Sequence, residues 1–344
     1  MNVLSLFDGM SCGQIALDQL DFNVDNYYAA EIDKWAIQVA KKNYPNTKHL
    51  GDVTELKGSD LPKIDLLMGG SPCQGFSFAG KQLNFDDPRS ALFFEFVRLL
   101  KETKPKYFML ENVRMKQEYQ DIISEHLGVK PIMINSALLS AQNRVRLYWT
   151  NIPGITQPED RGIVLKDILD DGVVYARHLK QKPELQKSDT ITNIKKGTSG
   201  YSWFMEQQTY AYESKKTRAL KAGGGSGNIP KVLRPCELKE FNPDSTCHHA
   251  ATATDIKGNE SIKRVYADSG KSPTLTTMGG GHREPKVLIE PLPPTYRKLT
   301  PLECERLQTV PDNYTDCVSN SQRYKMLGNG WTVDVIKHIL RNIE

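Results

Sequence analysis

The chain has 344 residues, of which 39% are hydrophobic and 25% are charged, with a formal net charge of +4 at pH 7. This composition is typical of a globular protein, and no apolar run reaches the roughly 20 residues needed to cross a membrane. Its six cysteines show no disulfide-framework spacing, and the slight positive charge permits a nucleic-acid partner without requiring one. We therefore expect a cytoplasmic protein of one or two domains, with no membrane partner.

In the first part of the chain, short apolar runs alternate with amphipathic ones. The pattern predicts strands at 3–7, 26–32, 64–68, 107–110 and 144–149, and helices at 13–20, 34–43, 89–102 and 117–127. Such alternation is typical of a parallel sheet covered by helices on both faces. The expected fold class is α/β.

From about residue 158 to 294 the composition shifts to Gly, Thr, Ser, Lys and Pro. Two similar stretches, 217–233 and 274–288, each carry three consecutive glycines and then Pro-Lys-Val-Leu. We interpret each as strand, glycine-rich turn, strand, which is either a plain β scaffold or one whose loops contact phosphates. Helical patterns then return, with a capping box at Thr300 and Glu303 and an amphipathic helix at 333–343.

A cysteine, Cys73, follows the end of the predicted strand at 64–68. Ligand crevices open at such strand ends in parallel sheets, and Pro72 fixes the backbone just before the cysteine. Gly75 and Gly80 leave the next segment free to move. Taken alone, Cys73 is either a packed small hydrophobe or a nucleophile on a hinged loop.

Acidic side chains follow two other predicted strands. The first strand leads into a glycine-containing turn at 8–13, Glu31 ends the second strand, and Asp52 comes later. A turn followed by an acid at this distance is typical of a nucleoside site, in which the carboxylate binds the ribose diol. The spacing Gly-x-Gly-x-x-Gly is absent, which favours an adenosine-type ligand such as S-adenosylmethionine over a dinucleotide.

Three further charged residues lie on predicted strands. Glu111 is either a helix cap or a proton donor beside Cys73. Arg144 and Arg146 alternate onto one strand face, as a solvated pair or as a guanidinium fork for a base carbonyl or a phosphate.

Together these residues resemble the cytosine-C5 DNA methyltransferase family, of bacterial or phage type. The resemblance rests on Phe7-x-Gly9, Glu31, Asp52, Pro72-Cys73-Gln74, Glu111-Asn112-Val113, Gln142-x-Arg144-x-Arg146, the run 297–308 and Gly328-Asn329-Gly330. Asp8 and the stretch 314–320 are similar to the vertebrate de novo enzymes. Departures are Ser11-Cys12 within the first motif and Gly330 where serine is common.

The resemblance implies a Rossmann-like S-adenosylmethionine-dependent domain and a smaller, mostly β target-recognition domain. The first comprises 1–160 completed by 322–344, and the second 161–321 with a variable part at about 162–294. It implies transfer of a methyl group to C5 of a flipped-out cytosine through a covalent bond between Cys73 and C6. Glu111 then acts on N3, and Arg146 with Arg144 holds O2, which makes these four residues the expected catalytic set.

The remaining expectations concern ligands and partners. The resemblance implies cofactor contacts from the motif residues and their neighbours, namely Phe7, Asp8, Gly9, Met10, Cys12, Glu31, Ile32, Asp52, Val53, Pro72, Leu92, Asn329 and Gly330. We expect DNA contacts from Gln74, Ser77, Lys81, Arg89, Arg264 and Arg283. No metal is expected, because the spacing of Cys236, Cys247, His248 and His249 fits no usual zinc finger. The expected partner is duplex DNA bound by a monomer, to which a cognate restriction nuclease is a possible addition. The alternative substrate is tRNA.

Overall fold

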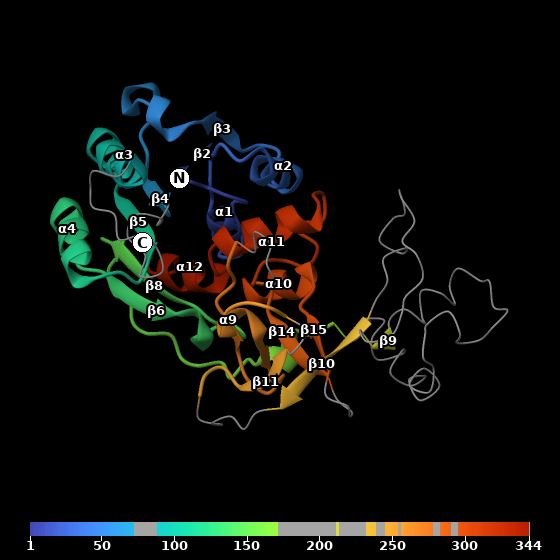
Figure 1. Cartoon of the computed structure of the whole chain (residues 1–344). Coiled ribbons are helices and arrows are strands. Elements are labelled where there is room, and N and C mark those ends of the chain that lie inside the picture. The colour runs from blue at the N-terminus through green and yellow to red at the C-terminus, as the bar shows by residue number, and fades with distance from the viewer. Residues whose placement is uncertain are drawn as a thin grey trace. The chain divides into compact units, whose positions relative to one another are not determined.

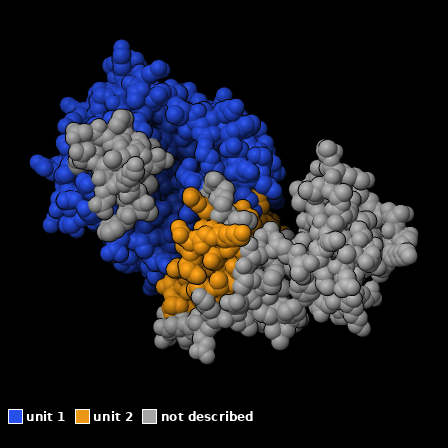
Figure 2. All heavy atoms as spheres, viewed as in Figure 1, with its two compact units in different colours: residues 1–164, 272–279, 304–344 blue, residues 165–271, 280–303 orange. Residues whose placement is uncertain are grey.

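The structure, a computed structural model, describes residues 1–71, 88–170, 211–212, 232–238, 245–253, 256–277, 283–289 and 295–343. The chain divides into two compact units, coloured blue and orange in Figure 2. Unit 1 comprises residues 1–164, 272–279 and 304–344, and unit 2 comprises 165–271 and 280–303. Residues 304–321, which the sequence interpretation put in the recognition domain, therefore group with unit 1.

Unit 1 is built on a seven-stranded sheet with the order β3-β2-β1-β4-β5-β8-β6 (Figure 1). The five strands from β3 to β5 are parallel, while β8 and β6 each run antiparallel to their neighbour. The bounds are β1 Asn2–Leu6, β2 Asn26–Ala30, β3 Lys48–Gly51, β4 Leu66–Gly69, β5 Tyr107–Val113, β6 Ile132–Asn135 and β8 Val145–Thr150. Because the chain turns back between β1 and β4, these two strands mark the topological switch point of the sheet.

Helices cover both faces of this sheet, as Figure 1 shows. Helices α3 (Pro88–Thr103) and α4 (Gln117–Leu127) contribute Phe93, Phe96 and Ile123 to one large buried cluster. On the other face, α1 (Cys12–Asp18) packs on α12 (Val333–Leu340), and α2 (Lys34–Asn43) joins β2 to β3. The predicted bounds of α2 and α4 are confirmed, because each has a clear apolar stripe between polar ends.

Unit 2 is mainly β. The pairings β11–β12–β14–β15–β10 continue back to β11, so five strands close on themselves and leave few open edges. The bounds are β9 Ala211–Tyr212, β10 Val232–Leu238, β11 His249–Ala253, β12 Arg264–Tyr266, β14 Lys286–Ile289 and β15 Thr295–Lys298, with short helices α5 Leu165–Ile168 and α9 Glu260–Lys263. An α/β domain with a smaller β domain is thus confirmed.

The second predicted hairpin is wrong. The residues before its glycines form β13 (Ser272–Pro273), which pairs with β7 (Gln142–Asn143) of unit 1, whereas β14 pairs with β12 and β15. Thr274 follows β13 and donates its hydroxyl to the carbonyl of Asn143, so this threonine bonds within unit 1 and not to a hairpin partner. The glycines themselves and the whole first repeat before β10 lie outside the described residues.

Two helices join the C-terminal part of unit 1. Helix α10 (Pro301–Leu307) begins with the predicted capping box, in which Thr300 N donates to Glu303 and Glu303 N donates to Thr300 Oγ1, at 2.7 and 3.2 Å. Helix α11 (Asn320–Asn329) leads into α12. None of the described helices is both long and apolar enough to cross a membrane.

Candidate active site

The strand registers bring four predicted site positions, together with Gly70, into one row. Gly51, Ala30, Leu6, Gly69 and Leu110 are register partners across β3, β2, β1, β4 and β5. The next residue of each strand or of the loop that follows it is therefore also in line. These five residues, Asp52, Glu31, Phe7, Gly70 and Glu111, are called the strand-end row below. The row crosses the switch point, where α/β proteins bind their ligands.

The turn between β1 and α1 has an unusual backbone. Phe7 and Ser11 adopt positive φ angles of 57° and 66°, in the left-handed region that side chains disfavour, and Gly9 between them has φ 60°. Strained non-glycine residues of this kind cluster at ligand sites. The backbone N–H of Gly9 donates to Glu31 Oε2 at 2.7 Å, which ties the turn to the end of β2.

Glu31 is held by the backbone. Its Oε1 accepts from the N–H groups of Ile32 and Asp33 at 2.8 Å each, in addition to the Gly9 bond on Oε2. A carboxylate has about four lone-pair sites, so Oε2 keeps one for a ligand hydroxyl. Ile32 beside it is 72% exposed, which leaves an apolar side chain uncovered at this edge of the sheet.

Asp52 and two apolar residues complete this side of the row. Both Asp52 hydrogen bonds to Thr54 engage Oδ1, at 2.9 Å, so among the described residues its Oδ2 is left for a ligand. Val53 is buried in the same apolar cluster against which Phe7 and Leu92 pack. The structure thus brings together five of the residues predicted to bind the cofactor, namely Phe7, Glu31, Asp52, Val53 and Leu92.

Asp8 lies under the turn rather than on its surface. Its carboxylate accepts hydrogen bonds from Ser11 Oγ and from Tyr27 Oη, the latter at 2.7 Å. Burial raises the pKa of Asp8 to about 6, because desolvation outweighs these bonds. The side chain therefore titrates near neutral pH and anchors the turn from below.

Glu111 faces Arg146 across two antiparallel strands. Tyr148 of β8 stands directly opposite Glu111, and Arg146 is the diagonal neighbour. Arg146 Nε lies 2.9 Å from Glu111 Oε1, although its N–H is not aligned for a hydrogen bond, so the contact is an ion pair. Both side chains are nearly buried, which strengthens their electrostatic attraction.

Arg144 points elsewhere. Its Nη1 donates to the carbonyls of Leu275 and Gly328, both at 3.2 Å, and its Nη2 donates to the carbonyl of Gly330 at 3.0 Å. The predicted pair of arginines on one strand face thus has two different sets of partners.

The turn at 328–331, called the closing turn below, packs against the β1–α1 turn. A Cβ on Gly330 would lie 2.9 Å from Met10 Cε and 3.2 Å from Cys12 Sγ, so this glycine allows the close approach. Burial raises the pKa of the Cys12 thiol to about 12, which keeps it inert. Asn329 is exposed at the end of α11.

Trp331 belongs to this site although sequence reasoning did not assign it a role. A Cβ on Gly70 would lie 2.8 Å from Trp331 Nε1 and 3.1 Å from Glu111 Oε2, so indole and carboxylate meet over Gly70. The indole also reaches Gly13 at the start of α1. The only signal in the sequence was a large aromatic residue after the glycine at 330.

The remaining residues predicted to bind the cofactor or DNA, and the predicted nucleophile, are not part of the strand-end row or the closing turn. Pro72, Cys73, Gln74, Ser77 and Lys81 lie outside the described residues, as does the side chain of Arg89. Arg264 and Arg283 are exposed in unit 2.

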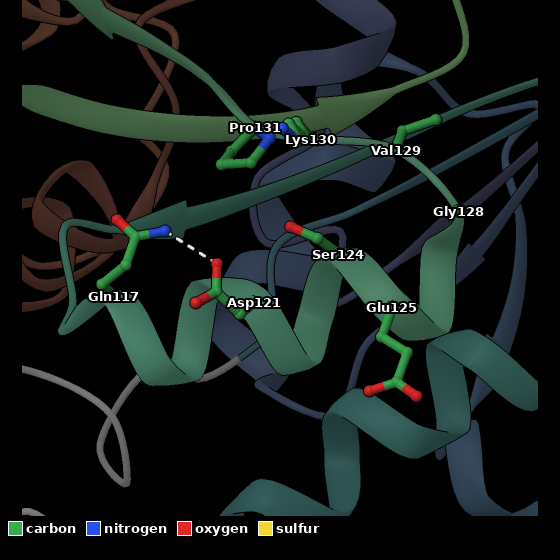
Figure 3. Close-up of a pocket in the computed structure, with 8 residues that line it drawn as sticks. All are labelled: Gln117, Asp121, Ser124, Glu125, Gly128, Val129, Lys130 and Pro131. Atoms are coloured by element: carbon green, nitrogen blue, oxygen red, sulfur yellow. Dashed lines mark hydrogen bonds between the residues drawn. The ribbon is translucent and has the colours of Figure 1, made fainter.

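A surface pocket of about 550 Å³ lies on α4 and the turn that follows it (Figure 3). Its lining includes Gln117, which donates to Asp121 at 2.8 Å, together with Ser124, Glu125 and residues 128–131. No predicted site residue lines it, so it is separate from the strand-end row.

Comparison with known proteins identifies the family. The model of the C-5 cytosine-specific DNA methylase family matches residues 1–344. The type II methyltransferase M.NgoBV of Neisseria gonorrhoeae is 32% identical over 98% of this chain and 97% of its own, and the orphan methyltransferase M.SPBetaI of Bacillus phage SPbeta is 28% identical over 100% and 97%.

Solved structures share the fold. A DNA modification methyltransferase encoded within a prophage of E. coli matches with a TM-score of 0.61 at 21% identity, covering 100% of this chain and 98% of that one. The methyltransferase EhMeth of Entamoeba histolytica matches with a TM-score of 0.64 at 15% identity, covering 99% and 97%. The chain therefore belongs to the C-5 cytosine-specific DNA methylase family and is a DNA cytosine methyltransferase.

Proposed function

We propose that this enzyme transfers the methyl group of S-adenosylmethionine to C5 of a flipped-out cytosine in duplex DNA, with Cys73 as the nucleophile. The observation that carries the proposal is the strand-end row. It sets acceptors for a nucleoside at one end, Glu111 with Arg146 at the other, and Gly70 between them, three residues before Cys73. Donor and base can therefore meet at one strand end.

The residues at the nucleoside end fit an adenosine-type methyl donor. Glu31 Oε2 suits a ribose hydroxyl, Asp52 Oδ2 suits an exocyclic amine, and Phe7 with exposed Ile32 offers apolar surface to adenine. S-adenosylmethionine supplies an electrophilic methyl group at its sulfonium. Met10, Cys12 and Gly330 pack closely where the two turns meet, which in this proposal is where the methionine part of the cofactor binds.

The chemistry requires three protein groups. The Cys73 thiolate forms a bond to C6, which makes C5 nucleophilic. Glu111 must be in its protonated form at this step, so that it donates the proton to N3 as electron density builds there and takes it back when the ring is restored. Arg146 holds O2 and stabilises the developing charge. After methylation at C5, loss of the C5 proton to a base restores the double bond and breaks the bond between C6 and sulfur.

The target base cannot react inside the stack, so it must leave the helix. In this proposal Gln74, Ser77 and Lys81 come from the segment 74–88 that closes over it, and Arg89 of α3 also contacts the DNA. Exposed Arg264 and Arg283 contact DNA from unit 2, and the protein acts as a monomer. A nuclease partner is not part of the proposal, since the relatives include both type II and orphan enzymes.

Bisulfite sequencing of DNA from cells that express the protein tests this proposal, because it reports the modified base and its sequence context together. We expect protected cytosines within one short sequence, and none in cells that express Cys73→Ser. Competition between unmethylated plasmid and bulk tRNA for labelled S-adenosylmethionine adds a direct assay. Labelling of the tRNA alone would contradict the proposal.

A further inference from the structure

Arg144 and Arg146 are two residues apart, yet they bond to different parts of unit 1. We propose that Arg144 is a positioning residue: it clamps residues 274–277 to the closing turn and so keeps that turn against the cofactor site. Arg146 alone then contacts the cytosine. This inference rests on the proposed use of S-adenosylmethionine and corrects one role that the family resemblance implied.

The donors of Arg144 are already committed to carbonyls. Three of its five N–H groups are directed at Leu275, Gly328 and Gly330, which come from two segments far apart in sequence. The residue is only 3% exposed. A base carbonyl would have to displace these bonds and leave buried peptide oxygens without donors, which is costly.

The electrostatic setting also favours a clamp. No carboxylate of the described residues forms an ion pair with Arg144, and desolvation lowers its pKa to about 10, with Arg146 adding repulsion. Removing a guanidinium from water without an ion-pair partner costs free energy, and hydrogen bonds to the three carbonyls are what offset this cost. Lysine cannot reproduce the planar fork that meets three carbonyls at once, so the site calls for arginine.

The segment held by Arg144 is also fixed by its neighbours. Ser272 N donates to the carbonyl of Ala141 at 2.7 Å, and Thr274 Oγ1 donates to the carbonyl of Asn143 at 2.7 Å. A Cβ on Gly328 would lie only 2.0 Å from the carbonyl oxygen of Thr276, so this glycine permits backbone contact. In the chain, unit 2 precedes and follows residues 272–279.

Release of the clamp has a defined consequence. Gly330 packs on Met10 and Cys12 of the β1–α1 turn, and Trp331 lies over Gly70 beside Glu111. If the closing turn shifts, the β1–α1 turn loses its cover and the indole leaves Glu111. Arg144 therefore acts on the cofactor site before any DNA is bound, which a base contact does not do.

The experiment compares Arg144→Lys and Arg144→Met with the matched variants Arg146→Lys and Arg146→Met. Calorimetry without DNA gives the affinity for S-adenosylhomocysteine, thermal melting gives stability, and kcat and KM are measured on unmethylated plasmid. The binding and rate measurements are made far below the melting temperature of each variant. We expect the Arg144 variants to bind S-adenosylhomocysteine about 10-fold or more weakly, with lysine milder than methionine, because charge-assisted bonds are lost.

The Arg146 variants are expected to keep the wild-type affinity and to lose methyl transfer. If Arg144→Met keeps that affinity and loses only transfer, it contacts the base and the proposal is wrong. If the melting temperature of Arg144→Met falls while its affinity and its methyl-transfer rate are unchanged, Arg144 has only a structural role, which also overturns the proposal. Should both Arg144 variants fail to fold, Thr274→Val, which removes one bond of the same segment, must weaken the affinity. Failure of the wild type to bind S-adenosylhomocysteine contradicts the proposed function instead.

Discussion

The strand-end row and the closing turn form two sides of one site by different means. Four positions in the row follow a short strand and the fifth, Glu111, lies within β5, so the registers of the sheet alone bring the five residues into line. The closing turn is held by side chains from distant segments, such as Arg144 and Gln308, whose Nε2 donates to Leu327 at 2.6 Å. Changes in the row should therefore alter the methyl-transfer rate, while changes behind the closing turn should alter stability and, at Arg144, the affinity for the cofactor.

Glu111→Gln tests the row and has the largest expected effect. The amide keeps the shape but cannot deliver a proton to N3, so kcat measured far below the melting temperature should fall by about 10²- to 10³-fold. The melting temperature should fall as well, because the nearly buried ion pair with Arg146 is lost. Initial rates with labelled S-adenosylmethionine measure this. Glu118→Gln is the control, because Glu118 is exposed on α4, and its kcat should match that of the wild type. An unchanged kcat would remove Glu111 from the mechanism.

Glu305→Gln tests a buried ion pair that joins α10 to α11, the helix that leads into the closing turn. Glu305 is fully buried and accepts from Asn313 N, from Thr315 N and Oγ1, and from Arg323 Nη2 at 2.9 Å. Loss of one partner in a buried pair costs about 3–5 kcal/mol of unfolding free energy, which denaturant melts will detect.

Asp312→Asn is the matched control for Glu305→Gln. Asp312 pairs with Arg306 on the surface of the same segment, so we expect a loss below about 1 kcal/mol. Equal losses for the two variants would show that burial does not distinguish these pairs.

Asp8, which lies under the β1–α1 turn, should make the stability of the protein depend on pH. Its pKa is about 6 in the folded protein against 3.8 for the free side chain, so the unfolded chain releases this proton first. The free energy of unfolding should fall as pH rises between these values, by at most about 3 kcal/mol, and then stay level. Asp8→Asn should lack this component when both proteins are unfolded with denaturant at pH 4 and pH 7. Parallel pH profiles would contradict the burial argument.

Lys325→Ala has the smallest expected effect. Lys325 of α11 pairs with Asp33 at the start of α2 at 2.7 Å, but the lysine side chain is 48% exposed. Solvent screening limits such pairs to under about 1 kcal/mol, and salt should reduce the difference from wild type. A larger loss in thermal melts would mean that the pair fixes α11 more firmly than its exposure suggests.

The sequence predicted what depends on local pattern. Apolar periodicity located α2 and α4, and the Thr300–Glu303 box marked the start of α10. The predicted strand ends correctly indicated that Glu31 and Glu111 lie along the same edge of the sheet. The sequence could not separate Arg144 from Arg146, because their partners at 275, 328 and 330 are set by tertiary packing. The threonine-rich stretch at 274–277 looked like a hairpin strand, but it follows β13, which pairs with the distant β7, and Thr274 bonds to Asn143 of β7 rather than to a neighbour in sequence.

The most direct test of the proposed mechanism is covalent capture on DNA that carries 5-fluorocytosine, because fluorine at C5 cannot leave as a proton and the adduct persists. With S-adenosylmethionine present, the account predicts a stable protein–DNA adduct whose peptide maps to Cys73, and none with Cys73→Ala. An adduct that persists in Cys73→Ala, or one that maps to another cysteine, would contradict it.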